Sequence, residues 1–203
     1  MSCVISAFLG YLLGCLSPSA LFGKMKKTDL RKKGTGNLGA TNTTLVLGKK
    51  YGFAVMVFDI FKAYMAVKIA KMLFPRVAIA GVVAGGFAVV GHIYPFYMRF
   101  KGGKGLAAFG GFVLVVDSML FLGLLTVSVV SVIIVNYTVA MPISAGILFP
   151  FLYYFKTGEL VGFIAVLLVS AVLIANHIPN VHRIKRGEDV RVREFFKEKL
   201  GGK

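Results

Sequence analysis

Seven long runs of apolar residues, with most charged side chains between them, constrain this 203-residue chain more than any other feature. About 20 apolar residues in a helix cross the hydrocarbon core of a bilayer and satisfy every backbone polar group internally. Because the runs do not alternate with period two, they argue against a β-barrel. The sequence predicts an all-α, polytopic membrane protein with seven transmembrane helices, over residues 3–22, 51–74, 77–98, 105–116, 119–135, 139–155 and 160–178.

The basic residues are concentrated in three of the segments that separate the apolar runs. Residues 24–50, 99–104 and 183–203 hold eight, three and eight of the 24 Lys and Arg residues. Seven crossings place all three segments on one side of the membrane, and cytoplasmic loops carry the excess of positive charge. We therefore expect the N-terminus outside and the C-terminus in the cytoplasm.

The formal net charge of +16 is also compatible with nucleic-acid binding. The basic residues lie between apolar spans and do not line the face of a soluble domain. This pattern favours membrane loops beside anionic lipid over nucleic-acid binding. We expect the lipid bilayer as a partner, no nucleic acid, and one integral-membrane domain over residues 1–203. The tail 192–200, with Phe195, Phe196 and Leu200 among charged residues, is expected to be a short helix on the membrane surface or a disordered segment.

The first basic segment combines glycines with neutral hydrogen-bonding side chains. Three glycines within six residues allow positive φ, so that neighbouring N–H groups turn toward one point, and such nests bind phosphate readily. The alternative is a plain flexible turn, which would not need the neighbouring Thr and Asn residues. We expect a phosphate site formed by Gly34, Thr35, Gly36, Asn37, Gly39, Thr41 and Asn42.

A second candidate lies where the third apolar run ends. Gly102 and Gly103 stand between Lys101 and Lys104, which brings backbone donors and two mobile positive charges together. The next helix is expected to begin directly afterwards, with the positive end of its dipole at the same place. Ordinary anchoring by positive loops is the alternative for the lysines. His92 is a candidate substrate-binding residue or only a helix-end polar residue, and a histidine at membrane depth usually has a partner.

A third candidate follows the last apolar run. His177, Asn180 and Arg183 are three residues apart and form a stripe on one helical side, and Pro179 loosens the helix between them. A histidine can act as acid, base or phosphate donor near neutral pH. The alternative is a polar stripe where the last helix leaves the membrane.

Two charged residues fall inside the second apolar run. Asp59 and Lys62 are three residues apart, and we interpret them as a structural pair that neutralises itself within the membrane. No metal-site or nucleophile motif occurs, and of the eight acidic residues only Glu188 and Asp189 are adjacent. We expect no metal and no cofactor. Any chemistry should depend on positioning and on positive charge around an anion.

Five stretches together resemble one family, the bacterial integral-membrane glycerol-3-phosphate acyltransferases that use acyl phosphate. They are spread over nearly the whole chain, and their combination is specific although no single piece is. They read TDLRKKGTGNLGATN at 28–42, LGKKYG at 47–52, FDIFK at 58–62, GHIYPFYMRFKGGKG at 91–105 and HIPNVHRIKRGED at 177–189.

The resemblance implies seven helices and an active site at the cytoplasmic face of the bacterial inner membrane. It implies acyl transfer from acyl phosphate to the sn-1 hydroxyl of glycerol 3-phosphate, giving lysophosphatidic acid and phosphate. The phosphate of the donor is expected to take the hydroxyl proton, which fits the missing carboxylate base. The catalytic residues it implies are Thr35, Lys104, His177 and Asn180.

The chain departs from the family pattern at several positions. Thr35 stands for the usual Ser and keeps the hydroxyl, whereas Leu45 stands for the usual Arg and loses a charge. Asn136 replaces the Arg of an Arg-Tyr pair in which Tyr137 is retained, and Pro142 replaces a following Ser. The alternative hypotheses are a catalytically impaired paralogue and a transporter that binds phosphate-containing ligands.

Overall fold

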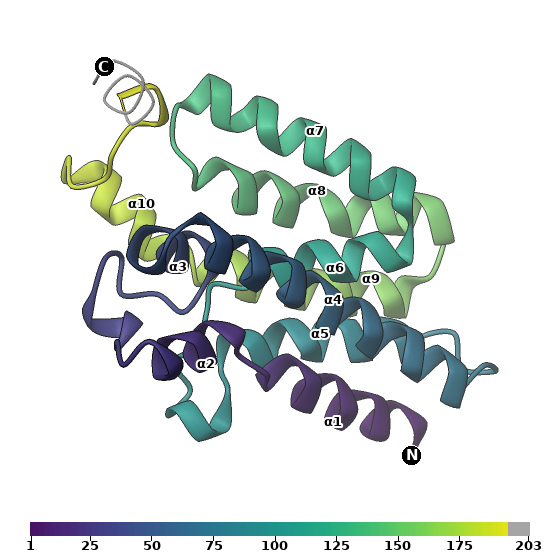
Figure 1. Ribbon diagram of the computed structural model, residues 1–203. Helices are drawn as coiled ribbons and strands as arrows, with labels where there is room; N and C mark the ends of the chain where they lie inside the picture. Colours follow the sequence, from purple (N-terminus) through teal and green to yellow (C-terminus); the bar gives the residue numbers. More distant parts are fainter. Residues whose placement is uncertain (195–203) are drawn as a thin grey trace. The chain divides into compact units, whose positions relative to one another are not determined.

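The protein is described by a computed structural model over residues 1–194, and every regular element in that range is a helix (Figure 1). The all-α prediction is therefore confirmed. Two compact units divide the chain, residues 1–118 and 119–203. Most of the tail predicted to lie on the membrane surface, from residue 195 onward, lies outside the described residues.

Four helical stretches are long and apolar enough to cross a membrane. They are Ser2–Met25, Ala80–Met98, Ser118–Val135 and Leu160–Lys185, and they fall on the first, third, fifth and seventh predicted runs. The fourth run is a shorter apolar helix, α6 (Leu106–Val116). The second and sixth runs are also helical, as α4 (Lys49–Leu73) and α8 (Ala140–Thr157).

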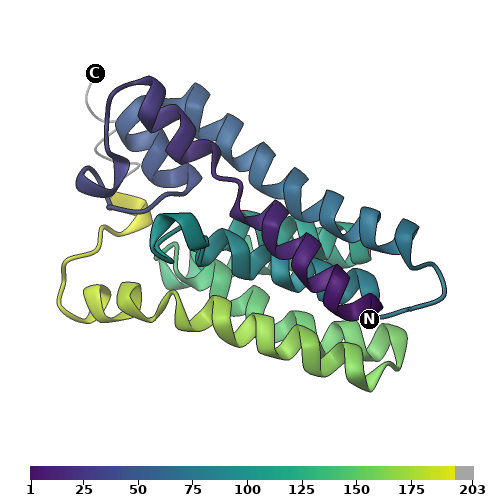
Figure 2. The same ribbon diagram turned by 90° about the horizontal axis from the view of Figure 1, so that it is seen from below.

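The first run is two helices, α1 (Ser2–Cys15) and α2 (Pro18–Met25), where the sequence analysis predicts one. Pro18 has no N–H to donate and cannot continue the preceding helix, but it suits the first position of a new one. Ser17 caps that new helix, because its hydroxyl accepts a hydrogen bond from the Ala20 N–H (3.3 Å). The chain changes direction at this link (Figure 2), which leaves the Leu16 carbonyl outside helical hydrogen bonding.

Helix α1 packs along α5 (Ala80–Ile93), beside which it runs in Figure 1. A Cβ placed on Gly10 would overlap the Ala84 backbone, and one on Gly14 would overlap the Ala88 backbone. Close backbone approach at small residues is how helices associate in lipid, where burial of apolar side chains supplies no driving force. The glycine spacing in the first run therefore determines which face of α1 contacts α5.

Helix α4 supports the rest of the first unit. It packs against α5 and against α6, where Gly111 allows close approach to the Ile60 backbone. A short helix, α3 (Ala40–Leu47), precedes α4 and packs on its start. The last three residues of the predicted 34–42 loop are thus helical, which corrects that part of the loop prediction. Two single turns complete the unit, η1 (Leu30–Lys32) and η2 (Phe96–Met98).

The second unit contains α7 (Ser118–Val135), α8, α9 (Leu160–Ala175) and α10 (Ile178–Lys185). Helices α8 and α9 pack together after a turn at Gly158, whose φ of 69° suits glycine. The last apolar run ends at Ala175, short of the predicted residue 178. Pro179 lies in the first turn of α10, which explains the interruption at residues 176–177.

Replacement of Gly14 by Ala should push α1 away from α5, because the added methyl group has backbone atoms in its path. We expect the free energy of unfolding to fall by roughly 1–3 kcal/mol. Gly123 in α7 is the matched control, since no atom lies within 4 Å of its added Cβ, and Gly123→Ala should be neutral or slightly stabilising. Thermal unfolding in detergent, followed by circular dichroism, measures both. Equal melting temperatures for the two variants would contradict the close packing.

Candidate active site

Two buried leucines hold the ends of the first predicted phosphate loop. Leu30 and Leu38 are 1% and 4% exposed and pack with Met98 of η2. Between them the backbone is left-handed at Gly34 and Gly36, with φ of 59° and 72°. Positive φ at these two glycines agrees with a nest. Gly39 has an extended φ of −125° and is instead the N-cap of α3.

Asn42 is the internal support of this loop. Its side chain is fully buried, its Oδ1 accepts the Thr35 N–H at 2.7 Å, and its Nδ2 donates to the Leu30 carbonyl at 2.8 Å. A Cβ on Gly34 would overlap the same Oδ1 atom. Asn42 therefore shapes the loop from inside. The predicted direct contact of Asn42 with a ligand has to compete with these two hydrogen bonds.

The groups that remain available to an anion lie at the start of α3. Its N-cap, Gly39, has no side chain that could cap the first N–H groups, and Thr41 is exposed in the first turn. Uncapped N–H groups at a helix start attract anions. Sequence reasoning missed this helix because Ala40–Leu47 is short and contains three Thr and one Asn, residue types that are weak helix formers. The exposed Thr35 and the half-buried Asn37 precede it.

The second predicted segment is built differently from the prediction. The Gly102 N–H donates to the Ile93 carbonyl (2.9 Å) and the Gly103 N–H to the His92 carbonyl (3.0 Å). These two amides thus complete the end of α5, which corrects the expectation that they donate to an anion. Both positions are glycine because a Cβ would overlap the His92 carbonyl or the His92 ring.

The end of this segment matches the prediction. Helix α6 begins at Leu106, with Gly105 as its N-cap at φ 92°. Lys104 is half-buried immediately before the helix start, whereas Lys101 is exposed. A lysine at a helix N-terminus places a positive charge beside the positive end of the dipole, a combination that suits an anionic ligand.

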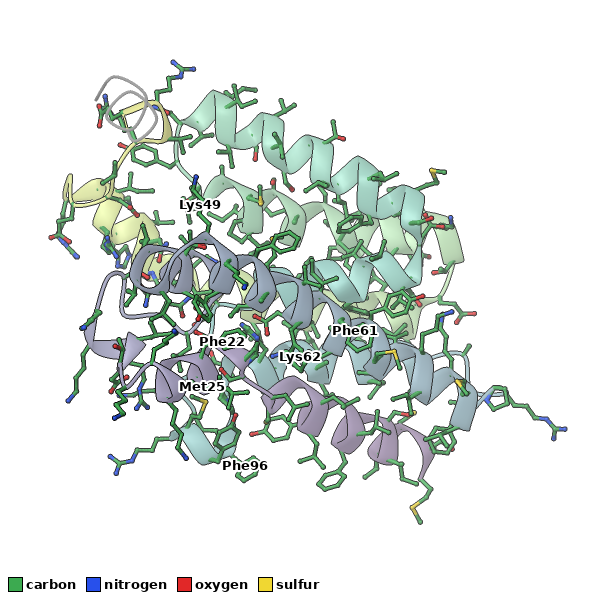
Figure 3. The ribbon with its side chains drawn as sticks, viewed as in Figure 1. Phe22, Met25, Lys49, Phe61, Lys62 and Phe96 are labelled. Atoms are coloured by element: carbon green, nitrogen blue, oxygen red, sulfur yellow. The ribbon has the colours of Figure 1, made fainter. Side chains whose placement is uncertain are left out.

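His92 is part of a buried cluster with the charged pair of α4. Lys62 Nζ lies 2.8 Å from Asp59 Oδ1, which confirms the predicted structural pair. His92 Nδ1 lies 2.9 Å from Lys62 Nζ and 3.2 Å from Asp59 Oδ1. Lys62, labelled in Figure 3, also donates to the Leu16 carbonyl at 2.6 Å. The partner expected for a histidine at membrane depth is therefore Lys62.

The third predicted segment belongs to the second unit. His177 is 5% exposed at the start of α10, and its Nδ1 donates to the Leu173 carbonyl at 2.8 Å. A carbonyl can only accept, so Nδ1 carries a proton and Nε2 is the lone-pair nitrogen of the neutral ring. Asn180 and Arg183 follow on α10 as half-buried residues, and Arg183 lies 4.0 Å from Asp189.

The acidic residues beside this segment are engaged with arginines. Arg186 donates to both carboxylate oxygens of Glu188, at 2.6 and 2.8 Å. The hydrogen bond from this guanidinium holds the pKa of the Glu188 carboxyl below its usual range. A carboxylate of lowered pKa is a weak general base, so Glu188 is poorly suited to remove a hydroxyl proton.

Two departures from the family pattern have a clear structural setting. Leu45 is 50% exposed on α3, close in sequence to the 34–42 loop that Asn42 supports from inside. At Tyr137 another arginine is present, because the Arg191 guanidinium donates to the Tyr137 hydroxyl (3.3 Å), while the Asn136 side chain accepts the backbone N–H of Arg193 (2.9 Å).

A cavity of about 390 Å³ lies beside the first loop. None of the predicted site residues lines it. Its wall combines apolar groups with basic side chains, and consists of Ser19, Ala20, Gly23, Lys24, Lys27, Thr28, Asp29, Leu30, Arg31, Leu38 and Met98. Among the described residues no group of three His, Cys, Asp or Glu could hold a metal ion.

Comparison with known proteins gives a consistent result. The family model described as "Glycerol-3-phosphate acyltransferase" matches residues 4–187. A protein of that name from Staphylococcus haemolyticus is 37% identical, over 95% of this chain and 99% of the relative. Another from Geobacillus kaustophilus is also 37% identical, over 91% and 93%.

Two solved structures have the same fold. Both are crystal structures of PlsY (YgiH), an integral membrane glycerol 3-phosphate acyltransferase. The glycerol 3-phosphate form has a TM-score of 0.86 at 31% identity and covers 94% of this chain and 96% of that chain. The lysophosphatidic acid form has a TM-score of 0.82 at 32% identity, over 94% and 95%.

Replacement of Asn42 by Ala should loosen the first loop. It leaves the Thr35 N–H and the buried Leu30 carbonyl without their partner, and an unpaired buried group costs about 1–3 kcal/mol. We expect faster amide hydrogen exchange over residues 30–39, measured by mass spectrometry. Thr41→Ala is the matched control, because this neighbouring side chain is exposed and should leave exchange unchanged. Equal exchange in both variants would contradict the supporting role of Asn42.

Proposed function

Because the chain belongs to the glycerol-3-phosphate acyltransferase family, we propose that it acylates glycerol 3-phosphate. The fatty acyl group passes from acyl phosphate to the sn-1 hydroxyl, and the products are lysophosphatidic acid and inorganic phosphate. The observation that carries this proposal is similarity over nearly the whole chain, to the family model at residues 4–187 and to a solved glycerol 3-phosphate form. The chain is a multi-pass integral membrane protein.

The chemistry needs positioning more than a strong base. The sn-1 oxygen attacks the acyl carbonyl carbon, the bond from that carbon to the phosphate oxygen breaks, and the departing phosphate takes the hydroxyl proton. Lys104, at the start of α6, offsets the negative charge of a phosphate group. The proton on Nδ1 of His177 leaves its Nε2 as an acceptor that can orient the attacking hydroxyl.

Thr35 and Asn180 complete the proposed catalytic set. The exposed Thr35 hydroxyl and the N–H groups at the start of α3 are donors for one phosphate. Asn180 offers both a donor and an acceptor from α10 for placing a substrate. Lys101 and Arg183 add positive charge at the edges of these segments.

For the whole chain we propose a single acyltransferase domain over residues 1–203 with seven membrane crossings. The crossings are α1 with α2, α4, α5, α6, α7, α8 and α9, with the N-terminus outside. The distribution of Lys and Arg supports this orientation, which places all three basic segments in the cytoplasm. The membrane is the bacterial cytoplasmic (inner) membrane, where both substrates reach the basic side.

Leu45 favours a second candidate function, a paralogue or transporter that binds phosphate compounds without acyl transfer. A charge-assisted phosphate contact is worth about 1.5–3 kcal/mol, and the leucine cannot make one. Phosphate and glycerol 3-phosphate counterflow in proteoliposomes separates the two candidates, because an acyltransferase produces none.

Purified protein supplied with acyl phosphate and glycerol 3-phosphate should release phosphate and form lysophosphatidic acid. Lys104→Ala and His177→Ala should each lower kcat/KM by roughly 100-fold or more, because each removes a group that acts on charge or geometry in the transition state. Lys68→Ala is the control, since this exposed lysine of α4 lies over the Tyr64 ring. Wild-type turnover no faster than that of Lys104→Ala would refute the acyltransferase function.

Leu45→Arg should increase activity, because it returns a guanidinium to the exposed face of α3 beside the first loop. We expect the KM of one phosphate substrate to fall about tenfold or more, the value of one charge-assisted hydrogen bond. Leu45→Gln, which removes the apolar surface without adding charge, is the matched control. An equal fall in KM for Leu45→Gln and Leu45→Arg would show that a positive charge at this position does not improve substrate binding.

A further inference from the structure

The buried cluster of Lys62, Asp59 and His92 is more than an ion pair, because it also includes a backbone carbonyl and an imidazole ring. The side chains of Lys62 and Asp59 are each 2% exposed and that of His92 is 6% exposed, so water does not complete their hydrogen bonding. Lys62 has three acceptors within reach of Nζ, namely the Leu16 carbonyl at 2.6 Å, Asp59 Oδ1 at 2.8 Å and His92 Nδ1 at 2.9 Å.

Three acceptors match the three protons of an ammonium group, and this match determines the proton position on His92. A buried carboxylate needs a counterion, and we assign this charge to Lys62 because its Nζ lies nearer to Asp59 Oδ1 (2.8 Å) than His92 Nδ1 does (3.2 Å). An ammonium group donates but cannot accept, so His92 Nδ1 must be an acceptor. The ring is therefore neutral, with its proton on Nε2. The 3.2 Å separation of His92 Nδ1 and Asp59 Oδ1 is then the approach of two acceptors that share one donor.

The protonated nitrogen of His92 faces the lysine-glycine turn. A Cβ added to Gly103 would overlap His92 Nε2, and the Gly103 N–H donates to the His92 carbonyl at 3.0 Å. Within residues 1–194, Nε2 itself makes no hydrogen bond. Lys104, the next residue, carries a charge suited to phosphate. A directed N–H donor thus lies against the turn that holds this lysine.

We propose that Lys62 is a positioning residue, which fixes His92 as a neutral ring with Nε2–H so that it donates to the phosphate held at the turn 101–105. This inference rests on the proposed acyltransferase function for the identity of the phosphate. It assigns to α4 a part in the reaction through Lys62 and Asp59, whose side chains are buried and act on the substrate only through His92. The break between α1 and α2 contributes as well, because it supplies the Leu16 carbonyl as the third acceptor.

Nitrogen-15 NMR of histidine-labelled protein tests the proton position without any substrate. The chain has three histidines, so the His92 signal is identified by its loss in His92→Gln. We expect the wild-type ring to be neutral with the proton on Nε2. In Lys62→Met the remaining partner is the Asp59 carboxylate, which accepts from Nδ1, so the Nδ1 signal should change to that of a protonated nitrogen. A wild-type Nδ1 that is already protonated, or a signal unchanged in Lys62→Met, overturns the proposal.

The double variant Asp59→Asn, Lys62→Met keeps the test clear if Lys62→Met alone fails to fold. The asparagine amide can donate to His92 Nδ1 and so return the proton to Nε2, without an unpaired buried charge.

Lys62→Met should raise the KM of the substrate held at the turn about tenfold, and the double variant should restore it. Lys68→Met, six residues further along the same helix, is the control and should change neither signal nor KM. A double variant with Nε2–H but unrestored KM would overturn the donor role. An inactive wild type with the expected NMR signals would refute the acyltransferase function alone.

Discussion

The buried ammonium of Lys62 is the interaction on which the first unit depends most. It connects the end of α1, its own helix α4 and the end of α5 through one carbonyl, one carboxylate and one imidazole. A charge this deep is tolerated only when all its protons have acceptors. The same requirement determines several features at once: the break at Leu16, the acid at position 59, and a histidine where α5 ends. Their agreement explains why a chain of mostly apolar helices holds its loops in one arrangement.

Both loops of the first unit are stabilised by internal hydrogen bonds from groups that the sequence analysis predicts to bind the ligand. Asn42 joins Thr35 to Leu30, and the Gly102 and Gly103 amides join the second turn to the end of α5. A phosphate site needs hydrogen-bond donors that keep their positions when the ligand leaves. Donors bonded within the protein provide the frame, and the contacts proposed for the ligand come from the exposed Thr35, the half-buried Lys104 and the start of α3.

Much of this architecture could be predicted from the sequence, and the errors have physical causes. The long continuous apolar runs predicted the helices, because lipid leaves the backbone little other choice. It did not predict the break before Pro18, although Ser-Pro is a recognised helix start, because a continuous apolar run outweighed one proline. Helix α3 was missed because its Thr and Asn residues favour loops, and only packing on α4 makes it helical. Motif spacing found the polar segments, but not which groups in them bond to the protein itself.

The two buried histidines show why that last distinction matters for the chemistry. His92 Nδ1 accepts from an ammonium group, whereas His177 Nδ1 donates to a carbonyl, so their outward nitrogens have opposite character. Identical side chains therefore serve as a donor and an acceptor, each determined by one neighbour inside its own unit. If the leaving phosphate acts as the base, as proposed above, fixed donors and acceptors are what the protein has to add. On the proposed mechanism, a further negative charge near two phosphates would weaken the binding of both, and the chain accordingly has only eight acidic residues.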